Sequence, residues 1–188
     1  YTINYSYSGV ENDHSVYSTS NFTTVKNCRI SEGTDTGGDN SGIQFENVKN
    51  GTTFNNTIIT IGTSSEAIAL YSSSNISILN NNLTAKNGGG KGIEITSSSF
   101  NFISDNAITT FDANGEGIRI GGSGGSNSNK IFNNNINTSG TTAEGIRMRI
   151  GNSNIFINNS IVTSGSRSKG LEFGTGPSNN NSFINTII

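Results

Sequence analysis

The sequence contains very few of the residues from which metal sites and covalent catalytic sites are usually built. Its 188 residues include one histidine, one cysteine, one methionine and no tryptophan. A metal site of the Cys/His type is therefore excluded, and Cys28 has no partner for a disulfide within the chain. Burial as a small side chain is favoured for Cys28, with a free thiol or a link between chains as the alternatives.

Charge of either sign is also scarce. Only 13% of the residues are charged, the formal net charge is −2, and no run of Lys or Arg is present. These features argue against a nucleic-acid partner. No apolar stretch approaches the roughly 18 residues that a membrane-spanning helix needs, so no membrane span is predicted. The chain begins with Tyr1 rather than Met, which indicates a removed leader or a trimmed chain, and we predict a secreted, extracellular or cell-surface protein.

Hydrophobic residues make up only 30% of the chain, and there is a single proline. Disordered chains are also poor in hydrophobic residues, but they are usually depleted in Ile and Phe, which recur here at regular positions. Gly, Ser, Thr and Asn are abundant between them. This composition favours an ordered, all-β protein with many turns.

One short motif recurs along the chain, as in "GKGIEI" (90–95) and "GEGIRI" (115–120). Its central glycine is spaced by 25 residues, except for one spacing of 28 that reflects three extra residues in "GGSGGSNSN" (121–129). A fixed period of this length is the signature of a solenoid in which each repeat is one coil. The glycine column consists of Gly42, Ala67, Gly92, Gly117, Gly145 and Gly170.

Each repeat contains positions for three short strands. The motif strand alternates apolar and variable residues, as in Ile118, Arg119 and Ile120, which predicts one buried face. A second apolar column consists of Ile30, Ile58, Leu83, Ile108, Ile136, Ile161 and Ile187, and a third of Ile78, Ile103, Ile131 and Phe156. Three strands separated by turns leave no room for helices.

An asparagine precedes the second apolar column by two residues in almost every repeat. Asn tolerates left-handed backbone and bonds to neighbouring backbone, and stacked copies can form an amide ladder. The predicted ladder consists of Asn56, Asn81, Asn106, Asn134, Asn159 and Asn185, with Cys28 at the position where the ladder would end. We interpret these residues as structural rather than catalytic.

The 25-residue period, the three strands and the asparagine column together resemble the right-handed parallel β-helix, and the "GIxI…N…NNxI" pattern looks like the repeats of pectate-lyase-like and NosD-like surface and carbohydrate-active proteins. The resemblance covers residues 21–188 and implies six to seven coils, with rungs about 4.8 Å apart. Residues 1–20 are predicted to be a separate N-terminal strand that caps the column or pairs with another subunit.

The variable positions of the motif strand carry charges that mostly alternate in sign from one repeat to the next. We interpret them first as a solvated face of salt bridges, each contributing about 0–1 kcal/mol. The alternative is a substrate groove: the resemblance to pectate-lyase-like enzymes implies that acidic and basic side chains on this strand bind sugar acids. That role would fall to Arg119 and Arg147, flanked by Glu94 and Glu172.

Other sites are weakly indicated. No cofactor is expected, although Asp35 and Asp39 in "EGTDTGGDN" (32–40) are a weak candidate for Ca²⁺ against the favoured ordinary turn. The Asp-Asp and Gly-His-Gly signatures of the polygalacturonase branch of the fold are absent. Asn50 and Asn75 stand in triplets that permit N-glycosylation if the protein is secreted.

The two ends suggest self-association. No cap follows Ile187 and Ile188, while Tyr1, Ile3, Tyr5 and Tyr7 alternate as in a strand. An open rung at one end and a strand at the other favour a head-to-tail homopolymer. The sequence therefore predicts a non-enzymatic extracellular structural protein that stacks into a filament, sheath or surface layer. The alternative is a carbohydrate-active or sugar-binding β-helix resembling a polysaccharide lyase, or a fragment of one.

Overall fold

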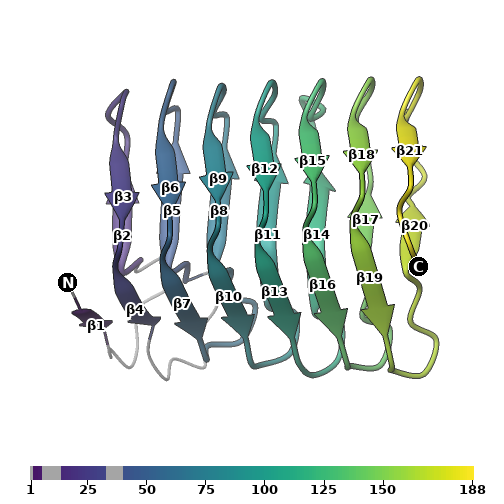
Figure 1. The fold of residues 1–188 in the computed structure, drawn as a ribbon, viewed down its shortest axis with the longest axis horizontal. Helices are drawn as coiled ribbons and strands as arrows, with labels where there is room; N and C mark the ends of the chain where they lie inside the picture. The colour runs from purple at the N-terminus through teal and green to yellow at the C-terminus, as the bar shows by residue number, and fades with distance from the viewer. Residues whose placement is uncertain (1, 6–13, 33–39) are drawn as a thin grey trace.

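The computed structural model describes residues 2–5, 14–32 and 40–188. In these residues 21 short strands form three parallel sheets of seven strands each, and the chain visits the sheets in turn (Figure 1). The predicted all-β parallel β-helix of about 25 residues per coil is confirmed, with about seven coils. The described residues contain no helix, and so none that is long and apolar enough to cross a membrane.

The strands of each sheet are stacked in sequence order along the column. Sheet A consists of β1 (Thr2–Tyr5), β4 (Arg29–Glu32), β7 (Thr57–Thr60), β10 (Asn82–Ala85), β13 (Ala107–Thr110), β16 (Asn135–Thr138) and β19 (Ser160–Thr163). Sheet B consists of β2 (Val16–Ser18), β5 (Ile43–Glu46), β8 (Ile68–Tyr71), β11 (Lys91–Thr96), β14 (Glu116–Gly121), β17 (Ile146–Met148) and β20 (Leu171–Phe173). Sheet C consists of β3 (Thr24–Lys26), β6 (Thr52–Phe54), β9 (Ser77–Leu79), β12 (Phe102–Ser104), β15 (Lys130–Phe132), β18 (Ile155–Ile157) and β21 (Ser182–Ile184).

The described part of the N-terminal segment lies on the same column. Strand β1 pairs with β4, placing Ile3 beside Ile30, and β2 pairs with β5, placing Val16 beside Ile43. Both roles expected for this segment, capping its own first coil and pairing with another subunit, stay predictions. Tyr1 and Tyr7, which were expected to help in assembly, lie outside the described residues.

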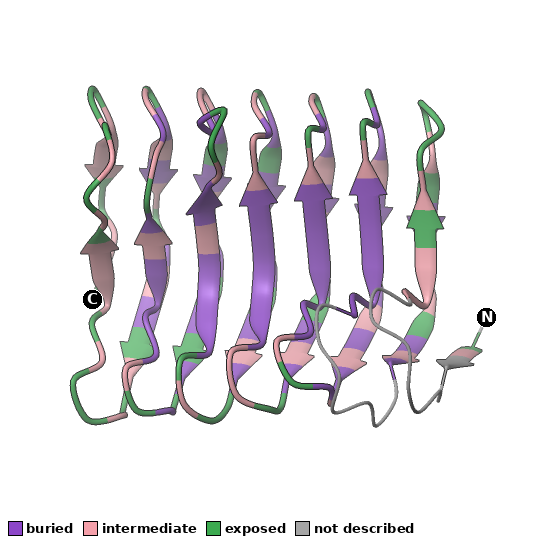
Figure 2. Cartoon of the chain, turned by 180° about the vertical axis from the view of Figure 1, so that it is seen from behind, coloured by how far each residue is buried: buried purple, intermediate pink, exposed green. Residues whose placement is uncertain are grey.

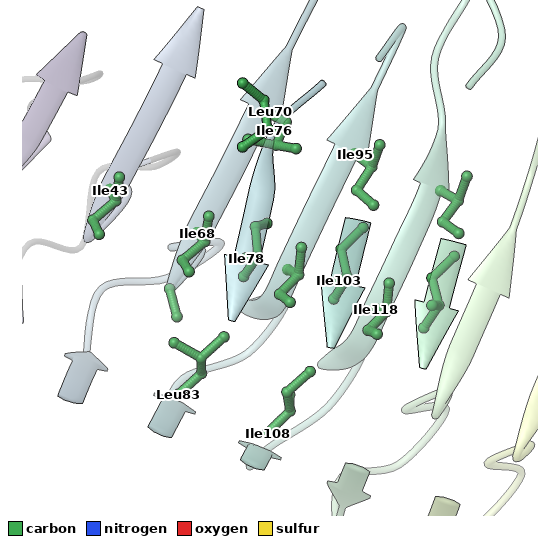
Figure 3. Packing of buried hydrophobic residues seen from close by; sticks show 14 of the residues in the cluster. Ile43, Ile68, Leu70, Ile76, Ile78, Leu83, Ile95, Ile103, Ile108 and Ile118 are labelled. Carbon is green, nitrogen blue, oxygen red and sulfur yellow. The ribbon is translucent and has the colours of Figure 1, made fainter. Parts of the chain in front are cut away.

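The core is a bundle of aliphatic rows that run along the column (Figure 3). Ile68 of sheet B pairs with Ile43 and Ile93 on the neighbouring rungs, and Ile103 of sheet C pairs with Ile78 and Ile131. These side chains are fully buried. Since each buried Ile or Leu stabilises the fold by about 1.5–3 kcal/mol, the repeated rows explain how a chain with so few hydrophobic residues still folds.

The glycine of the motif is needed where sheet A turns into sheet B. A Cβ on Gly92 would lie 2.2 Å from Cγ2 of Ile108 and 2.6 Å from the carbonyl oxygen of Gly117. The glycine column therefore makes room for the branched methyl group of the isoleucine column in sheet A. Ala67 replaces glycine in the one coil whose isoleucine is replaced by Leu83, a residue that is not branched at Cβ.

The asparagine ladder is present inside the turn that leads from sheet C to sheet A. Nδ2 of each asparagine donates to Oδ1 of the next at 2.9–3.0 Å, from Asn56 to Asn159. The backbone N of Cys28 donates to Oδ1 of Asn56, so the ladder ends at Cys28 as predicted. A second ladder, not predicted, lies in the turn from sheet B to sheet C and consists of Asn101, Asn129, Asn154 and Asn181.

The predicted register of the last rung was wrong. Ile187 pairs with Ser160, so Ile188 and not Ile187 continues the isoleucine column of sheet A. Asn185 is exposed with φ at 49° and continues the outer turn position of Asn158, whereas Thr186 occupies the ladder position. The cause is two extra residues in the loop 174–181, which shift everything that follows.

Candidate functional site

Two columns of charged residues lie side by side on the outer face of sheet B and form an ion-pair network. One column consists of Glu66, Lys91, Glu116, Glu144 and Lys169, and the other of Glu94, Arg119, Arg147 and Glu172. Nζ of Lys91 lies 2.6 Å from Oε1 of Glu66 and 3.3 Å from Oε2 of Glu94. A guanidinium nitrogen of Arg119 lies 3.6 Å from Oε1 of Glu94. The network continues along the column through Glu116, Arg147, Glu172 and Lys169.

Much of the charged columns is buried, although the sequence predicted a solvated face; Lys169, at one end, is the exposed member. Glu66, Lys91, Glu94, Glu116 and Glu144 are each less than a tenth exposed. In Figure 2, which views the molecule from the side opposite to Figure 1, the middle strands of sheet B are buried along most of their length. Each side chain is flanked by side chains on the rungs above and below, and the two adjacent columns cover each other.

Burial makes the local charge balance important. Burial opposes the charge of Lys91, but the carboxylates of Glu66 and Glu94 outweigh that effect and raise the pKa of Lys91. Burial likewise opposes ionisation of Glu94, but Lys91 and Arg119 outweigh it and lower the pKa of Glu94. Both groups are therefore held in their charged forms at neutral pH. The network therefore places a fixed pattern of charges on this face of the column.

A groove of about 410 Å³ adjoins this network where sheet B turns toward sheet C. Its lining residues are Tyr71, Glu94, Thr96, Arg119, Gly122, Ser123, Arg149, Ile150, Thr175 and Gly176. These residues come from five successive coils. With rungs about 4.8 Å apart, the outermost of these coils are separated by about 19 Å along the column.

The lengths of the loops between sheets B and C account for the position of the groove. Counted from the rung position of Tyr71 to the residue before the strand of sheet C, the segments 71–76, 96–101 and 149–154 have six residues each, whereas 121–129 has nine and 174–181 has eight. The short loop that begins at Arg149 thus lies between two longer ones. Gly122, Ser123, Thr175 and Gly176 of the longer loops line the groove on either side of it.

Arg149 is the residue of the groove that the sequence did not single out. It is exposed, and its neighbours on the adjacent rungs are glycines: a Cβ on Gly121 would lie 3.1 Å from Cβ of Arg149, and one on Gly174 would lie 3.1 Å from its Cα. No carboxylate of the described residues pairs with its guanidinium group. The signal in the sequence that could have drawn attention to this region is the three-residue insertion in 121–129, on the rung before Arg149.

Only two of the four residues predicted to form a substrate groove line the groove in the structure. Glu94 and Arg119 line the groove, whereas Arg147 and Glu172 belong to the ion-pair network and are not among the lining residues. The weak calcium candidates Asp35 and Asp39 lie outside the described residues. The glycosylation candidates Asn50 and Asn75 are exposed, with positive φ of 59° and 55°, in the same turn of adjacent coils.

A family model described as "Periplasmic copper-binding protein (NosD)" matches residues 1–186. No curated protein sequence matches the chain. The fold is similar to that of a solved periplasmic alginate epimerase, AlgG, with a TM-score of 0.67 and 15% identity over 95% of this chain and 43% of that one. The A-module of the mannuronan C-5 epimerase AlgE4 from Azotobacter vinelandii gives a TM-score of 0.49 and 11% identity over 89% and 62% of the chains.

These comparisons bear on the fold and the location of the chain. It spans less than half of the AlgG chain that it resembles, and at 15% identity the likeness shows the parallel β-helix alone. The description of the family places its members in the periplasm, which agrees with the predicted export of the chain. A location at the cell surface stays a prediction.

The residues of this chain do not fit a copper centre. Copper sites are built mainly from His, Cys and Met side chains, and the whole chain has one of each. Cys28 precedes β4 and Met148 lies in β17, at least four rungs or about 19 Å apart along the column. No three His, Cys, Asp or Glu residues gather in a metal-binding arrangement anywhere in the described part of the chain.

Proposed function

The chain belongs to the NosD family, and we propose that it is a polysaccharide-binding β-helix whose ligand lies along the groove beside sheet B. The observation that carries the proposal is the shape of the groove, which crosses five coils and is open to solvent between two lengthened loops. A groove lined by five successive coils, whose outermost rungs lie about 19 Å apart, suits consecutive units of an extended polymer.

The groups that line the groove support a sugar ligand. Thr96, Ser123 and Thr175 present hydroxyl groups, and Tyr71 adds an aromatic ring with a phenolic hydroxyl. Such groups both donate and accept hydrogen bonds, as the hydroxyls of a sugar do. The similarity in fold to a periplasmic alginate epimerase, an enzyme named for its polysaccharide, adds support to this choice over the structural filament.

Binding is proposed rather than turnover because the groove has poor acid–base groups. Glu94 is the one carboxylate among its lining residues, and Lys91 and Arg119 lower its pKa. A general base works best with a pKa near the operating pH, so an ionised, ion-paired Glu94 is a weak base. Its role in this proposal is to hold Arg119 in place at the edge of the groove.

The test is affinity electrophoresis of the purified protein through gels that contain acidic or neutral polysaccharides. We expect retardation by at least one polysaccharide, and loss of that retardation when the groove is blocked by Ser123→Trp or Thr175→Trp. Both positions are exposed, so the larger side chains are compatible with folding. Asn137→Trp, on the exposed face of sheet A, is the matched control and should leave retardation unchanged. Retardation by no polysaccharide would refute the proposal.

End-to-end stacking of subunits stays a prediction beside this proposal. The last described rung exposes Ile184, Ile187 and Ile188, and Ile3 lies in the first strand of sheet A. Electron micrographs of the native protein would test stacking directly, since filaments would be visible without any added sugar.

A further inference from the structure

Resting on the proposed function, we infer that the bound polysaccharide is acidic and that Arg149 binds the anionic group of one of its sugar units. Two anionic groups are candidates, the carboxylate of a uronic acid and a sulfate ester, and both present a pair of anionic oxygens. A planar guanidinium group binds either through two parallel hydrogen bonds.

Arg149 differs from every other basic residue on this face of the column. Lys91, Arg119, Arg147 and Lys169 each pair with at least one glutamate. Arg149 lies on the same side of the molecule and has no such partner among the described residues, although it lines the groove. The four paired cations are neutralised by their glutamates, whereas the charge of Arg149 is available to a ligand.

The groove carries a positive charge in an acidic chain. Its charged lining residues are Arg119, Arg149 and Glu94, which leave one net positive charge, whereas the chain as a whole has a formal net charge of −2. Glu94 is already engaged by Lys91 and Arg119, so it does not compete strongly for Arg149. The positive charge that remains in the groove is therefore located at Arg149.

The backbone around Arg149 leaves its guanidinium accessible along the direction of the polymer. Gly121 and Gly174, on the rungs before and after it, have no side chain that would cover it or pair with it. Hydroxyl groups of Ser123 and Thr175 lie in the groove on these same two sides. A sugar unit whose anionic group contacts Arg149 therefore has hydrogen-bonding partners for the hydroxyls of its neighbouring units.

The experiment measures dissociation constants of the full chain for four polymers by biolayer interferometry. The polymers are polyuronate, the same polyuronate after reduction of its carboxyl groups, dextran and dextran sulfate. Wild type is compared with Arg149→Gln and with Arg29→Gln, which removes the same charge from an exposed position on sheet A. Circular dichroism melting curves show that each variant is folded.

We expect wild type to bind an anionic polymer at least 10-fold more tightly than its neutral counterpart. Because a hydrogen bond to a charged group is worth about 1.5–3 kcal/mol, Arg149→Gln should weaken that binding by about 10-fold or more, and Arg29→Gln by less than about 2-fold. The anionic polymer that shows the larger Arg149 effect identifies the group as carboxylate or sulfate.

The failures of the two proposals are distinguishable. Equal affinity for acidic and neutral polymers, or equal effects of Arg149→Gln and Arg29→Gln, would overturn the role of Arg149 and leave a neutral-sugar groove if Ser123→Trp still blocks binding. The absence of binding to every polymer, together with no retardation in the wider set of gels, would overturn the proposed function itself.

Discussion

Lys91 and Glu66 form a short ion pair, with 2.6 Å between Nζ and Oε1, and both side chains are almost fully buried. Removing one partner of a buried pair is far more harmful than removing one partner of an exposed pair, because the remaining charge is left without compensation. Lys91 also lies 3.3 Å from Glu94, so its loss would leave two buried carboxylates close together.

We therefore expect Lys91→Met to lower the free energy of unfolding by about 3–5 kcal/mol. Urea denaturation followed by circular dichroism measures the change. Lys169→Met is the matched control, because Lys169 also pairs with a glutamate but its side chain is 56% exposed. Its effect should stay below about 1 kcal/mol. Equal effects of the two substitutions would show that burial of the Lys91 pair has no energetic consequence.

The ionised form of Glu144 should lower the free energy of unfolding at neutral pH, whereas the ionised form of Glu94 should raise it. Burial, together with repulsion from Glu172 and Glu116, raises the pKa of Glu144. A raised folded-state pKa means that ionisation costs stability once the pH rises through it, and that no cost remains below the unfolded pKa. Glu144→Gln should therefore stabilise the protein at pH 7, by up to about 1 kcal/mol, and have little effect near pH 4.

Thermal unfolding of Glu144→Gln and wild type from pH 4 to pH 8 tests this expectation. Glu94→Gln provides the contrast: the pKa of Glu94 is lowered, so its contribution is present at neutral pH and is lost as the pH falls. That substitution should destabilise at pH 7. Parallel pH profiles for the two variants would contradict the opposite directions of their pKa shifts.

Gly92→Ala should be strongly destabilising, since its Cβ would lie 2.2 Å from Cγ2 of Ile108. Overpacking of this kind costs about 1–3 kcal/mol. Adding Ile108→Leu should recover part of the loss, because the same chain already pairs Ala67 with Leu83 in the neighbouring coil. Denaturant unfolding of the single and double variants measures the coupling. An additive double variant would mean that the two columns are independent.

Asn106 and Asn185 should respond very differently to substitution, although the sequence placed them in one ladder. Asn106 is buried and donates to Oδ1 of Asn134 at 2.9 Å, whereas Asn185 is exposed in the outer turn. Asn106→Ala leaves buried groups unpaired and should cost about 2–4 kcal/mol. Asn185→Gly, which keeps the positive φ accessible, should change the melting temperature very little.

The repeating part of the molecule could be predicted because an inward position meets the same surroundings in every coil. Ile93 lies between Ile68 and Ile118, so the same aliphatic packing recurs from rung to rung. The pairing of Glu94 with Arg119 on adjacent rungs was foreseen for the same reason. Their burial was not foreseen, because it depends on two columns covering each other, which is a property of packing rather than of spacing.

The groove could not be predicted from the repeat because it is built from departures from the repeat. Arg149 stands in a column whose other members include Thr96, Gly121 and Gly174, so no shared residue type marks the position. The three extra residues of 121–129 were visible as a changed spacing. The two extra residues of 174–181 were hidden after the last glycine of the motif, and the same omission caused the error in register at Asn185.

The loops between sheets B and C leave and rejoin the column at equivalent positions in every coil, whatever their length. The coil that carries a lengthened loop, and with it the position of the groove, can therefore change without a change in the column. Moving the insertion around Gly122 to a neighbouring coil would displace the groove by one rung while every buried row stayed as it is. Under the proposed function, small insertions and deletions in these loops would change the polymer that is bound, while the buried rows that fold the column stay the same.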